Sequence, residues 1–149
     1  MIWTPRVTVA AVIEREGRFL LVEEVIDGEI RFNQPAGHLE PGESLLDAVQ
    51  REVLEETAHP FEPLGLVGVY QYEMAHRRCT YLRFCFAGTV GEAEPGRALD
   101  EEIVATHWLT REEIEERRER LRSPMVLACI HDHLQGAALP LDSLHYLTA

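Results

Sequence analysis

No hydrophobic run in the sequence is long enough to span a membrane, and no stretch resembles a targeting segment. The apolar run at residues 7–13 is interrupted by Thr8 and is followed by Glu14-Arg15-Glu16, whereas a transmembrane helix needs about 20 apolar residues. Internal repeats, low-complexity tracts and linkers are also lacking. We therefore expect a cytoplasmic protein with no membrane partner. Its residues 1–149 are expected to form a single domain, since this length suits one hydrophobic core.

Basic residues and cysteines are both scarce. The chain has 14 basic against 26 acidic residues, and its net charge is −12. This charge argues against binding to nucleic acid and fits a site that needs a cation before it can accept an anionic substrate. The three cysteines, Cys79, Cys85 and Cys129, are odd in number and lie in apolar runs. We therefore expect buried thiols and no disulfide.

The hydrophobic pattern predicts strands before and after one long helix. Residues 6–14 and 18–25 are predicted to form a β-hairpin around Gly17. The helix is expected to begin after the N-cap Ser44 and to end before Pro60. Further strands are expected at residues 29–34, 64–74, 79–90 and 103–109, and further helices at residues 111–121 and 124–135. This order predicts the α+β class, with helices covering a mixed sheet.

Three glutamates at helical spacing are the most informative feature of the chain. Glu52, Glu55 and Glu56 stand at positions i, i+3 and i+4, so their carboxylates project from one face of the predicted helix. Like charges at this spacing destabilise a bare helix by roughly 0.2–0.5 kcal/mol per pair, and a bound cation would remove that repulsion. Oxygen ligands favour Mg²⁺ or Mn²⁺ over zinc. The alternative is a solvated acidic face.

The residues around these glutamates follow the spacing G-x5-E-x7-R-E-x-x-E-E, and this pattern resembles the signature of the Nudix hydrolases. The positions that carry the resemblance are Gly37, Glu43, Arg51, Glu52, Glu55 and Glu56. The sequence departs from the family where a glycine and an aliphatic residue usually follow, because Ala58 and His59 stand there. The departure affects the end of the helix and leaves the acidic face intact.

The resemblance implies an α/β/α sandwich with a mixed β-sheet, in which the signature forms a loop, a helix and a second loop. It also implies catalysis with Mg²⁺, or Mn²⁺, held by Glu52, Glu55, Glu56 and the backbone carbonyl of Gly37. Arg51 would orient the carboxylates, although a purely structural ion pair is equally compatible with its position. Glu43 is either a metal ligand or an acid that favours the positive end of the helix dipole.

Other candidate site residues lie outside the signature. A carboxylate must take a proton from the attacking water, and Glu52, Glu56 or an acid of the loop at residues 91–102 could do so. The loop candidates are Asp100, Glu101 and Glu102. The candidate substrate-binding residues are Arg31, Gln34 and Arg83.

Segments along residues 6–145 resemble a phosphatase branch of the family, among them NQPAGHLEPGE, YLRFCFAG and LRSPMV. This resemblance implies hydrolysis of phosphoanhydride bonds in nucleoside di- and triphosphates or thiamine-pathway diphosphates, with release of orthophosphate. The alternatives are a Nudix enzyme that releases pyrophosphate or cleaves nucleotide sugars, an isomerase of prenyl diphosphates, and a nucleotide-binding module without activity. The expected partner is a small-molecule substrate, and the protein is expected to be a monomer or a small homo-oligomer.

Overall fold

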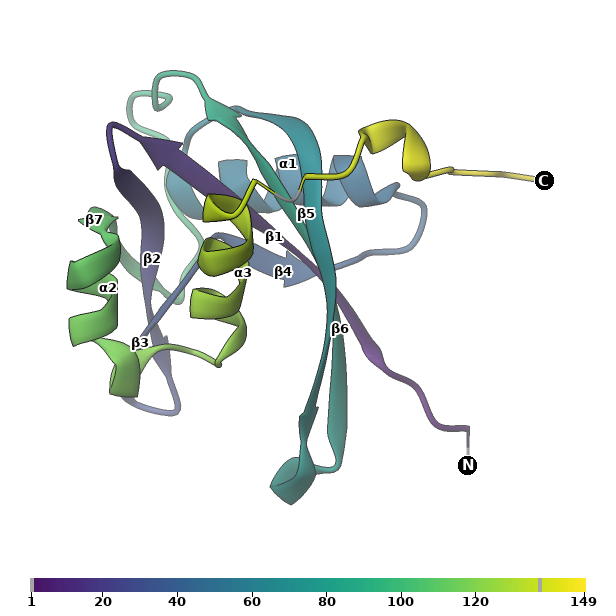
Figure 1. Cartoon of the computed structure of the whole chain (residues 1–149), viewed down its shortest axis with the longest axis horizontal. Coiled ribbons are helices and arrows are strands. Elements are labelled where there is room, and N and C mark those ends of the chain that lie inside the picture. Colours follow the sequence, from purple (N-terminus) through teal and green to yellow (C-terminus); the bar gives the residue numbers. More distant parts are fainter. Residues whose placement is uncertain (1, 137) are drawn as a thin grey trace.

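The computed structural model describes residues 2–136 and 138–149, and these form a mixed sheet covered by helices on both faces (Figure 1). Seven strands are present in the described residues, and five of them follow the order β3-β2-β1-β6-β5. The strands are β1 (Arg6–Arg15), β2 (Arg18–Ile26), β3 (Glu29–Asn33), β4 (Ala36–His38), β5 (Phe61–Met74), β6 (Cys79–Val90) and β7 (Ile103–Thr110). The predicted α+β class and α/β/α sandwich are confirmed.

Strand β1 is the centre of the sheet, and one of its edges is divided between two partners. Residues 6–13 of β1 pair in parallel with β6, with Thr8 opposite Arg83. On the other edge, residues 8–10 pair with β4, whereas Glu14 and Arg15 pair with β2 through the predicted hairpin. Because β4 and β2 pair with different residues along the same edge of β1, the sheet divides into two branches. Strand β4 forms the first branch and β2 begins the second, and a cavity lies between them.

The hairpin between β1 and β2 turns where the sequence predicts it. Glu16 and Gly17 have φ angles of 52° and 75°, and two successive left-handed residues are typical of a tight two-residue hairpin turn. Strand β2 then pairs with β3 and with β7, so β2 forms the middle of the second branch. Strands β5 and β6 form a long antiparallel hairpin that extends beyond the body of the sheet (Figure 1).

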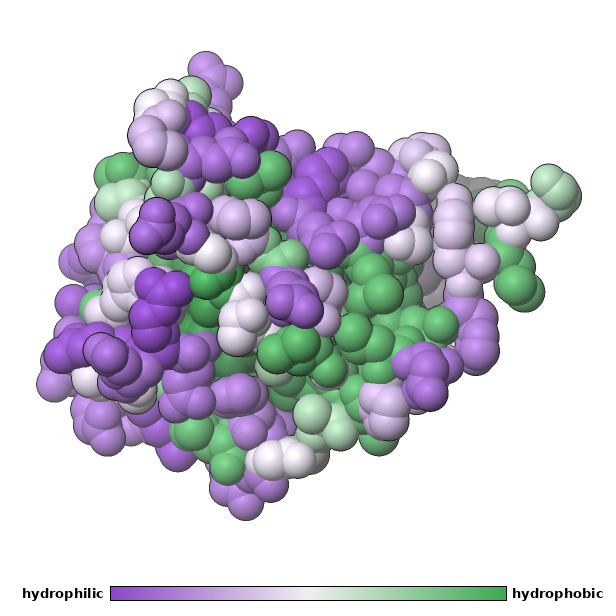
Figure 2. All heavy atoms as spheres, turned by 90° about the horizontal axis from the view of Figure 1, so that it is seen from above, coloured by the Kyte–Doolittle hydropathy of each residue, from purple (hydrophilic) through white to green (hydrophobic). Residues whose placement is uncertain are grey.

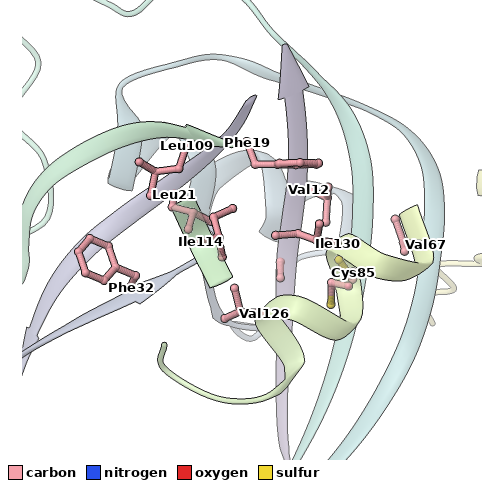
Figure 3. Close-up of a cluster of buried hydrophobic side chains, with 12 residues drawn as sticks. Val12, Phe19, Leu21, Phe32, Val67, Cys85, Leu109, Ile114, Val126 and Ile130 are labelled. Carbon is pink, nitrogen blue, oxygen red and sulfur yellow. The ribbon is translucent and has the colours of Figure 1, made fainter. Parts of the chain in front are cut away.

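Helices cover both faces of the sheet because neighbouring residues of β1 point to opposite sides. Helix α1 (Leu45–Thr57) buries Ala48, Val49 and Val53 against the face that carries Val9, Ala11 and Phe86. Helix α3 (Met125–Leu134) and the short helix α2 (Arg111–Glu116) bury the opposite face, which carries Val12 and Cys85 (Figure 3). All three cysteines are free thiols; Cys85 and Cys129 are buried, as predicted, whereas Cys79 is only partly buried.

Helix α2 is shorter than the predicted range of residues 111–121. Its N-terminus agrees with the prediction, because Thr110 and Glu113 form a capping box. The helix ends at Glu116, and a 3-10 turn follows at Arg118–Arg120. Ile114 is the only side chain of α2 that is buried, so little apolar contact holds further turns against the sheet.

None of the helices in residues 2–136 and 138–149 is long and apolar enough to cross a membrane. Figure 2 shows that hydrophilic side chains cover much of the surface when the molecule is seen from above, with hydrophobic side chains gathered toward the middle of this view.

Helix α1 ends at Thr57, and the chain leaves it through a left-handed residue at Ala58. Ser44 is the N-cap, as predicted, and accepts a hydrogen bond from the Asp47 N–H. Ala58 has a φ of 62°, so this alanine adopts the conformation for which glycine is usual. The exit therefore precedes Pro60 and does not depend on it.

We expect Ala58→Gly to raise the melting temperature by about 1–2 °C and to leave turnover unchanged. Glycine avoids the steric cost of the left-handed conformation, which destabilises the folded state by roughly 1 kcal/mol for alanine. Part of that gain is lost because the Ala58 methyl group is buried. Thermal unfolding measures the difference. The matched control is Ala48→Gly, which replaces a fully buried alanine inside the same helix and should lower the melting temperature. A similar decrease for Ala58→Gly would contradict the expectation.

Candidate active site

The acidic side of α1 faces β4 and the loop at residues 91–102, and it is partly removed from solvent. Glu52 and Glu56 are only 8% and 4% exposed, whereas the side chain of Glu55 is 35% exposed. Glu56 Oε1 accepts a hydrogen bond of 2.9 Å from the Ala36 N–H at the start of β4. The carboxylates are therefore held between the helix and the strand rather than spread over a solvated surface, and the solvated-face interpretation is wrong for Glu52 and Glu56.

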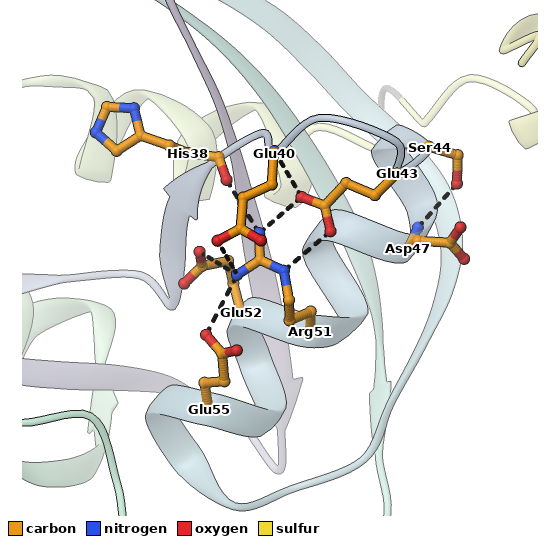
Figure 4. A network of polar contacts seen from close by, with 8 residues as sticks. All are labelled: His38, Glu40, Glu43, Ser44, Asp47, Arg51, Glu52 and Glu55. Atoms are coloured by element: carbon orange, nitrogen blue, oxygen red, sulfur yellow. Dashed lines mark hydrogen bonds and ion pairs between the residues drawn. The ribbon is translucent and has the colours of Figure 1, made fainter.

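Arg51 connects Glu43, which precedes helix α1, to Glu52 and Glu55 on the acidic face of that helix (Figure 4). Its guanidinium donates two hydrogen bonds to Glu43, of 2.7 and 2.9 Å, and one each to Glu52 at 2.8 Å and Glu55 at 3.2 Å. A further bond of 3.0 Å goes to the backbone carbonyl of His38. These bonds lower the pKa of Glu43 and raise that of Arg51. Arg51 thus fixes the orientation of the acidic face, and Glu43 is bound to Arg51.

Gly37 lies directly against the carboxylate of Glu52. A Cβ atom at this position would overlap the Glu52 Cδ, Oε1 and Oε2 atoms. Only glycine leaves room for Glu52 to pack on β4 in this orientation. A glycine is therefore required at this position of the signature for a steric reason, which the spacing alone does not show.

The loop before β7 contributes a fourth carboxylate to the acidic face. One oxygen atom each from Glu52, Glu55 and Asp100 lies within 4.8 Å of the others, as in a group that could hold a metal ion. The backbone places Asp100 there, because its N–H donates to the Glu55 carbonyl over 3.1 Å. Of the other two acids considered in this loop, Glu102 lines the same cavity, whereas Glu101 does not. Asp100 and Glu102 are thus the loop acids that line the cavity.

Burial and mutual repulsion raise the pKa values of three of the acidic side chains, Glu52, Glu56 and Asp100. Burial is the main cause of the increase to about 7 at Glu52 and to about 9 at Glu56, and neighbouring carboxylates add to it. The pKa of Asp100 is raised for the same two reasons. A divalent cation among these oxygens would stabilise their ionised forms. The donor set consists of carboxylate oxygens, which suits Mg²⁺ or Mn²⁺.

The acidic group forms one wall of a cavity of about 700 Å³ between the two branches of the sheet. This volume lies in the range that takes a small-molecule ligand, roughly 300–1,000 Å³. Other parts of the lining come from β2 and β3 and from β5 and β6, and the last two strands contribute Tyr72, Met74, Tyr81 and Arg83. The sequence analysis did not identify Tyr81 as a site residue, although Tyr81 and Arg83 follow the same strand alternation. The cavity therefore has an acidic wall and an aromatic wall that contains a cation.

The three predicted substrate-binding residues have different surroundings. Arg83 lines the cavity and is 3% exposed. Arg31 also lines the cavity but forms an ion pair with Glu29. Gln34 is 1% exposed, donates to the Val126 carbonyl and accepts a hydrogen bond from Arg83. The interpretation of Gln34 as a residue that faces the substrate is wrong, because both ends of its amide are used inside the protein.

A mixed sheet between helices, with glycine, arginine and three glutamates on a loop-helix-loop beside the cavity, defines a Nudix domain. The family described as the NUDIX domain matches residues 4–128, and the chain belongs to the Nudix family. The protein is therefore a Nudix hydrolase.

Two relatives resemble nearly the whole chain. Phosphatase NudJ of Escherichia coli K12 is 39% identical over 140 residues, which cover 94% of this chain and 90% of the relative. The solved structure of a NUDIX hydrolase from Nitrosomonas europaea is 50% identical and superposes with a TM-score of 0.94, covering 97% of this chain and 98% of the other. The MutT protein of Methanosarcina mazei Go1 is 25% identical, with a TM-score of 0.72, over 91% of this chain and 99% of that protein.

We expect Gly37→Ala to reduce turnover on the order of 10²-fold, because the new methyl group displaces the Glu52 carboxylate and small displacements in an active site have such effects. The melting temperature should change little, since the displaced atoms are the end of a flexible side chain. Steady-state rates and thermal unfolding test this together. The control is Gly88→Ala, whose Cβ would overlap the backbone of Glu62 and should lower stability without altering the site. Normal turnover in Gly37→Ala would contradict the expectation.

The metal-free protein should lose stability as the pH rises from 7 to 9. The folded-state pKa of Glu56 is about 9 and exceeds the ordinary value of 4.5, so in this window the folded state binds more protons than the unfolded state and the free energy of unfolding falls. At pH 8, Glu56→Gln should raise the melting temperature by about 2–4 °C, the shift that roughly 1 kcal/mol produces in a chain of this size.

Thermal unfolding in a chelating buffer, with and without added Mg²⁺, measures this effect. Added Mg²⁺ should oppose the loss in the wild type more strongly than in Glu56→Gln. A wild-type melting temperature that rises between pH 7 and 9 without metal would be inconsistent with the raised pKa of Glu56.

Proposed function

We propose that the protein hydrolyses a phosphoanhydride bond in nucleoside di- or triphosphates, or in small heterocyclic diphosphates such as those of the thiamine pathway, and releases orthophosphate. The observation that carries this proposal is the convergence of Glu52, Glu55 and Asp100 within 4.8 Å at the wall of a ligand-sized cavity. The relative NudJ, which is named a phosphatase, supports orthophosphate as the product. The enzyme would act as a single domain in the cytoplasm.

The acidic side chains would hold a divalent cation, Mg²⁺ or Mn²⁺. Glu52, Glu55 and Asp100 are the first candidates because their oxygens already converge. Glu56 and the Gly37 carbonyl, both beside the same cavity, complete the proposed set. When bound, such an ion lowers the pKa of a water molecule and offsets negative charge on phosphoryl oxygens.

The protein side chains would position the substrate and accept a proton. Arg51 holds Glu43, Glu52 and Glu55 in fixed orientations through its hydrogen bonds. The carboxylate that receives the proton from the attacking water must lie within about 3 Å of it or one water molecule away. Glu52 and Glu56 are our candidates, because each is buried beside the cavity. Glu56 has Oε2 available, since Oε1 accepts the Ala36 N–H.

Binding of Mg²⁺ and turnover distinguish these roles. We expect Glu52→Gln, Glu55→Gln and Glu56→Gln each to reduce turnover on the order of 10²-fold or more. A variant that loses turnover but is still stabilised by Mg²⁺ has lost the proton acceptor, whereas a variant that loses both has lost a metal ligand. Near-normal turnover in all three variants would show that the metal assignment is wrong.

Hydrolysis of GDP with Mg²⁺ in ¹⁸O-labelled water tests the reaction itself. Attack at the terminal phosphorus places the label in orthophosphate, whereas attack at the inner phosphorus places it in GMP. Discrimination among bases should be weak, within about 1–2 kcal/mol, because a phosphatase needs firm contacts with the phosphates rather than with the base. A reaction limited to nucleoside triphosphates, with pyrophosphate as product, would refute the proposed phosphatase activity.

A further inference from the structure

The cations of the cavity differ in whether a carboxylate neutralises them. All 14 basic residues of the chain are arginines, and five of them line the cavity. Four are within 4.0 Å of a carboxylate: Arg31 of Glu29, Arg51 of Glu43, Arg77 of Asp27, and Arg122 of Glu24. Arg83 forms no ion pair with any residue that the structure describes. It is therefore the cavity arginine whose charge is not neutralised by an acidic side chain.

Arg83 is also almost completely buried, at 3% exposure. Its guanidinium donates to Gln34 Oε1 over 2.8 Å and to Asn33 Oδ1 over 3.1 Å, and Cys129 Sγ lies 3.9 Å away. Its Nε atom is buried and has no hydrogen-bond partner among the described residues. A buried cation with neutral partners and an unused donor is costly in a folded protein unless the site gains something from it.

The protein holds this guanidinium in a fixed position in the part of the cavity lining that β6 provides. Gln34 is itself fixed by its hydrogen bond of 2.7 Å to the Val126 carbonyl. In the sheet, Arg83 lies opposite Thr8 of β1, and Thr8 lies opposite His38 of β4. Arg83 is thus two strand spacings, about 10 Å, from the strand that carries Gly37 and contacts Glu52.

We propose that Arg83 binds an anionic oxygen of the substrate phosphate that is not attacked. This inference rests on the proposed function, because it assumes that the attacked phosphate lies at the acidic wall. The acidic side chains and their cation then hold one phosphate, and the second phosphate still carries negative charge that needs a donor. Arg83 supplies the compensating positive charge without first breaking an ion pair. Its fixed fork of donors also suits phosphate oxygens geometrically.

A purely structural role is the competing explanation, since Arg83 links β6 to β3 and to α3. Such a cross-link would need the hydrogen bonds of Arg83 but no ligand. The Cys129 thiol lies beside the guanidinium, and hydrogen bonding with Cys85 and the charge of Arg83 lower its pKa against the effect of burial. Variants at Arg83 and at Cys129 therefore separate anion binding from packing.

The test is calorimetric titration of the protein with imidodiphosphate in the presence and absence of Mg²⁺. Arg83→Met removes the charge from a side chain of similar length and should weaken binding on the order of 10- to 100-fold, the range for a charged hydrogen bond. Arg83→Lys keeps the charge but loses the forked arrangement of donors, and its affinity should lie between those of the wild type and Arg83→Met. Arg111→Met is the control for net charge, because Arg111 lies on α2 and pairs with Glu115; its affinity should equal that of the wild type.

Cys129→Ala controls for packing, since it removes a neighbour of the guanidinium and keeps the charge. Its affinity for imidodiphosphate should equal or exceed that of the wild type. The proposal is overturned if Arg83→Met binds imidodiphosphate as tightly as the wild type, or if Cys129→Ala loses as much affinity as Arg83→Met. It is also overturned if Arg83→Met raises the KM for GDP but leaves the affinity for imidodiphosphate unchanged, because the arginine would then contact the base or ribose.

Imidodiphosphate has a P–N–P link in place of the bridging oxygen, and its binding is read without any turnover. A wild-type protein that binds it through Arg83 but hydrolyses no diphosphate would refute the proposed function and keep the anion site. If the wild type hydrolyses GDP and the Arg83→Met variant binds imidodiphosphate as tightly as the wild type, the proposed function stands and the anion site is refuted.

Discussion

The division of one edge of β1 between β4 and β2 is the constraint on which the site depends. A strand has one set of hydrogen-bonding groups on each edge, so residues that pair with β4 are not available to β2. The two partners must leave β1 in sequence along its length, and the sheet separates into two branches. The cavity occupies that separation, with β4 and α1 on one side and β5 and β6 on another. The ligand site is thus a consequence of strand pairing.

The acidic wall carries more negative charge than the positive charge of Arg51 can balance. Arg51 is shared by Glu43, Glu52 and Glu55, and it makes no ion pair with Glu56 or Asp100. Burial raises the pKa of Glu56 to about 9 in the absence of a cation. The same geometry that makes the metal-free site unfavourable makes it suitable for a divalent ion, because the repulsion and desolvation are already present when the ion binds.

Local residue patterns predicted the elements and the acidic face, because their causes are local. Gly17 sets a tight turn, Ser44 caps α1, and Glu52 and Glu55 share a helix face through their spacing alone. The sequence did not predict how Asp100 reaches that face, since its position depends on a backbone hydrogen bond to Glu55 from a separate loop.

The substrate side of the cavity was harder to predict because its arginines differ only in whether they have a carboxylate partner. Arg31 and Arg83 are equivalent in the sequence, because both are arginines in predicted strands. Only the three-dimensional contacts show that Arg31 has a carboxylate partner and that Arg83 has amide oxygens instead. Gln34 looks like a polar residue beside the site, yet its burial makes it a support for Arg83. The two walls therefore pose opposite electrostatic demands, an excess of anions on one and an unneutralised cation on the other. A metal-bound diphosphate carries charges of both signs and meets both demands.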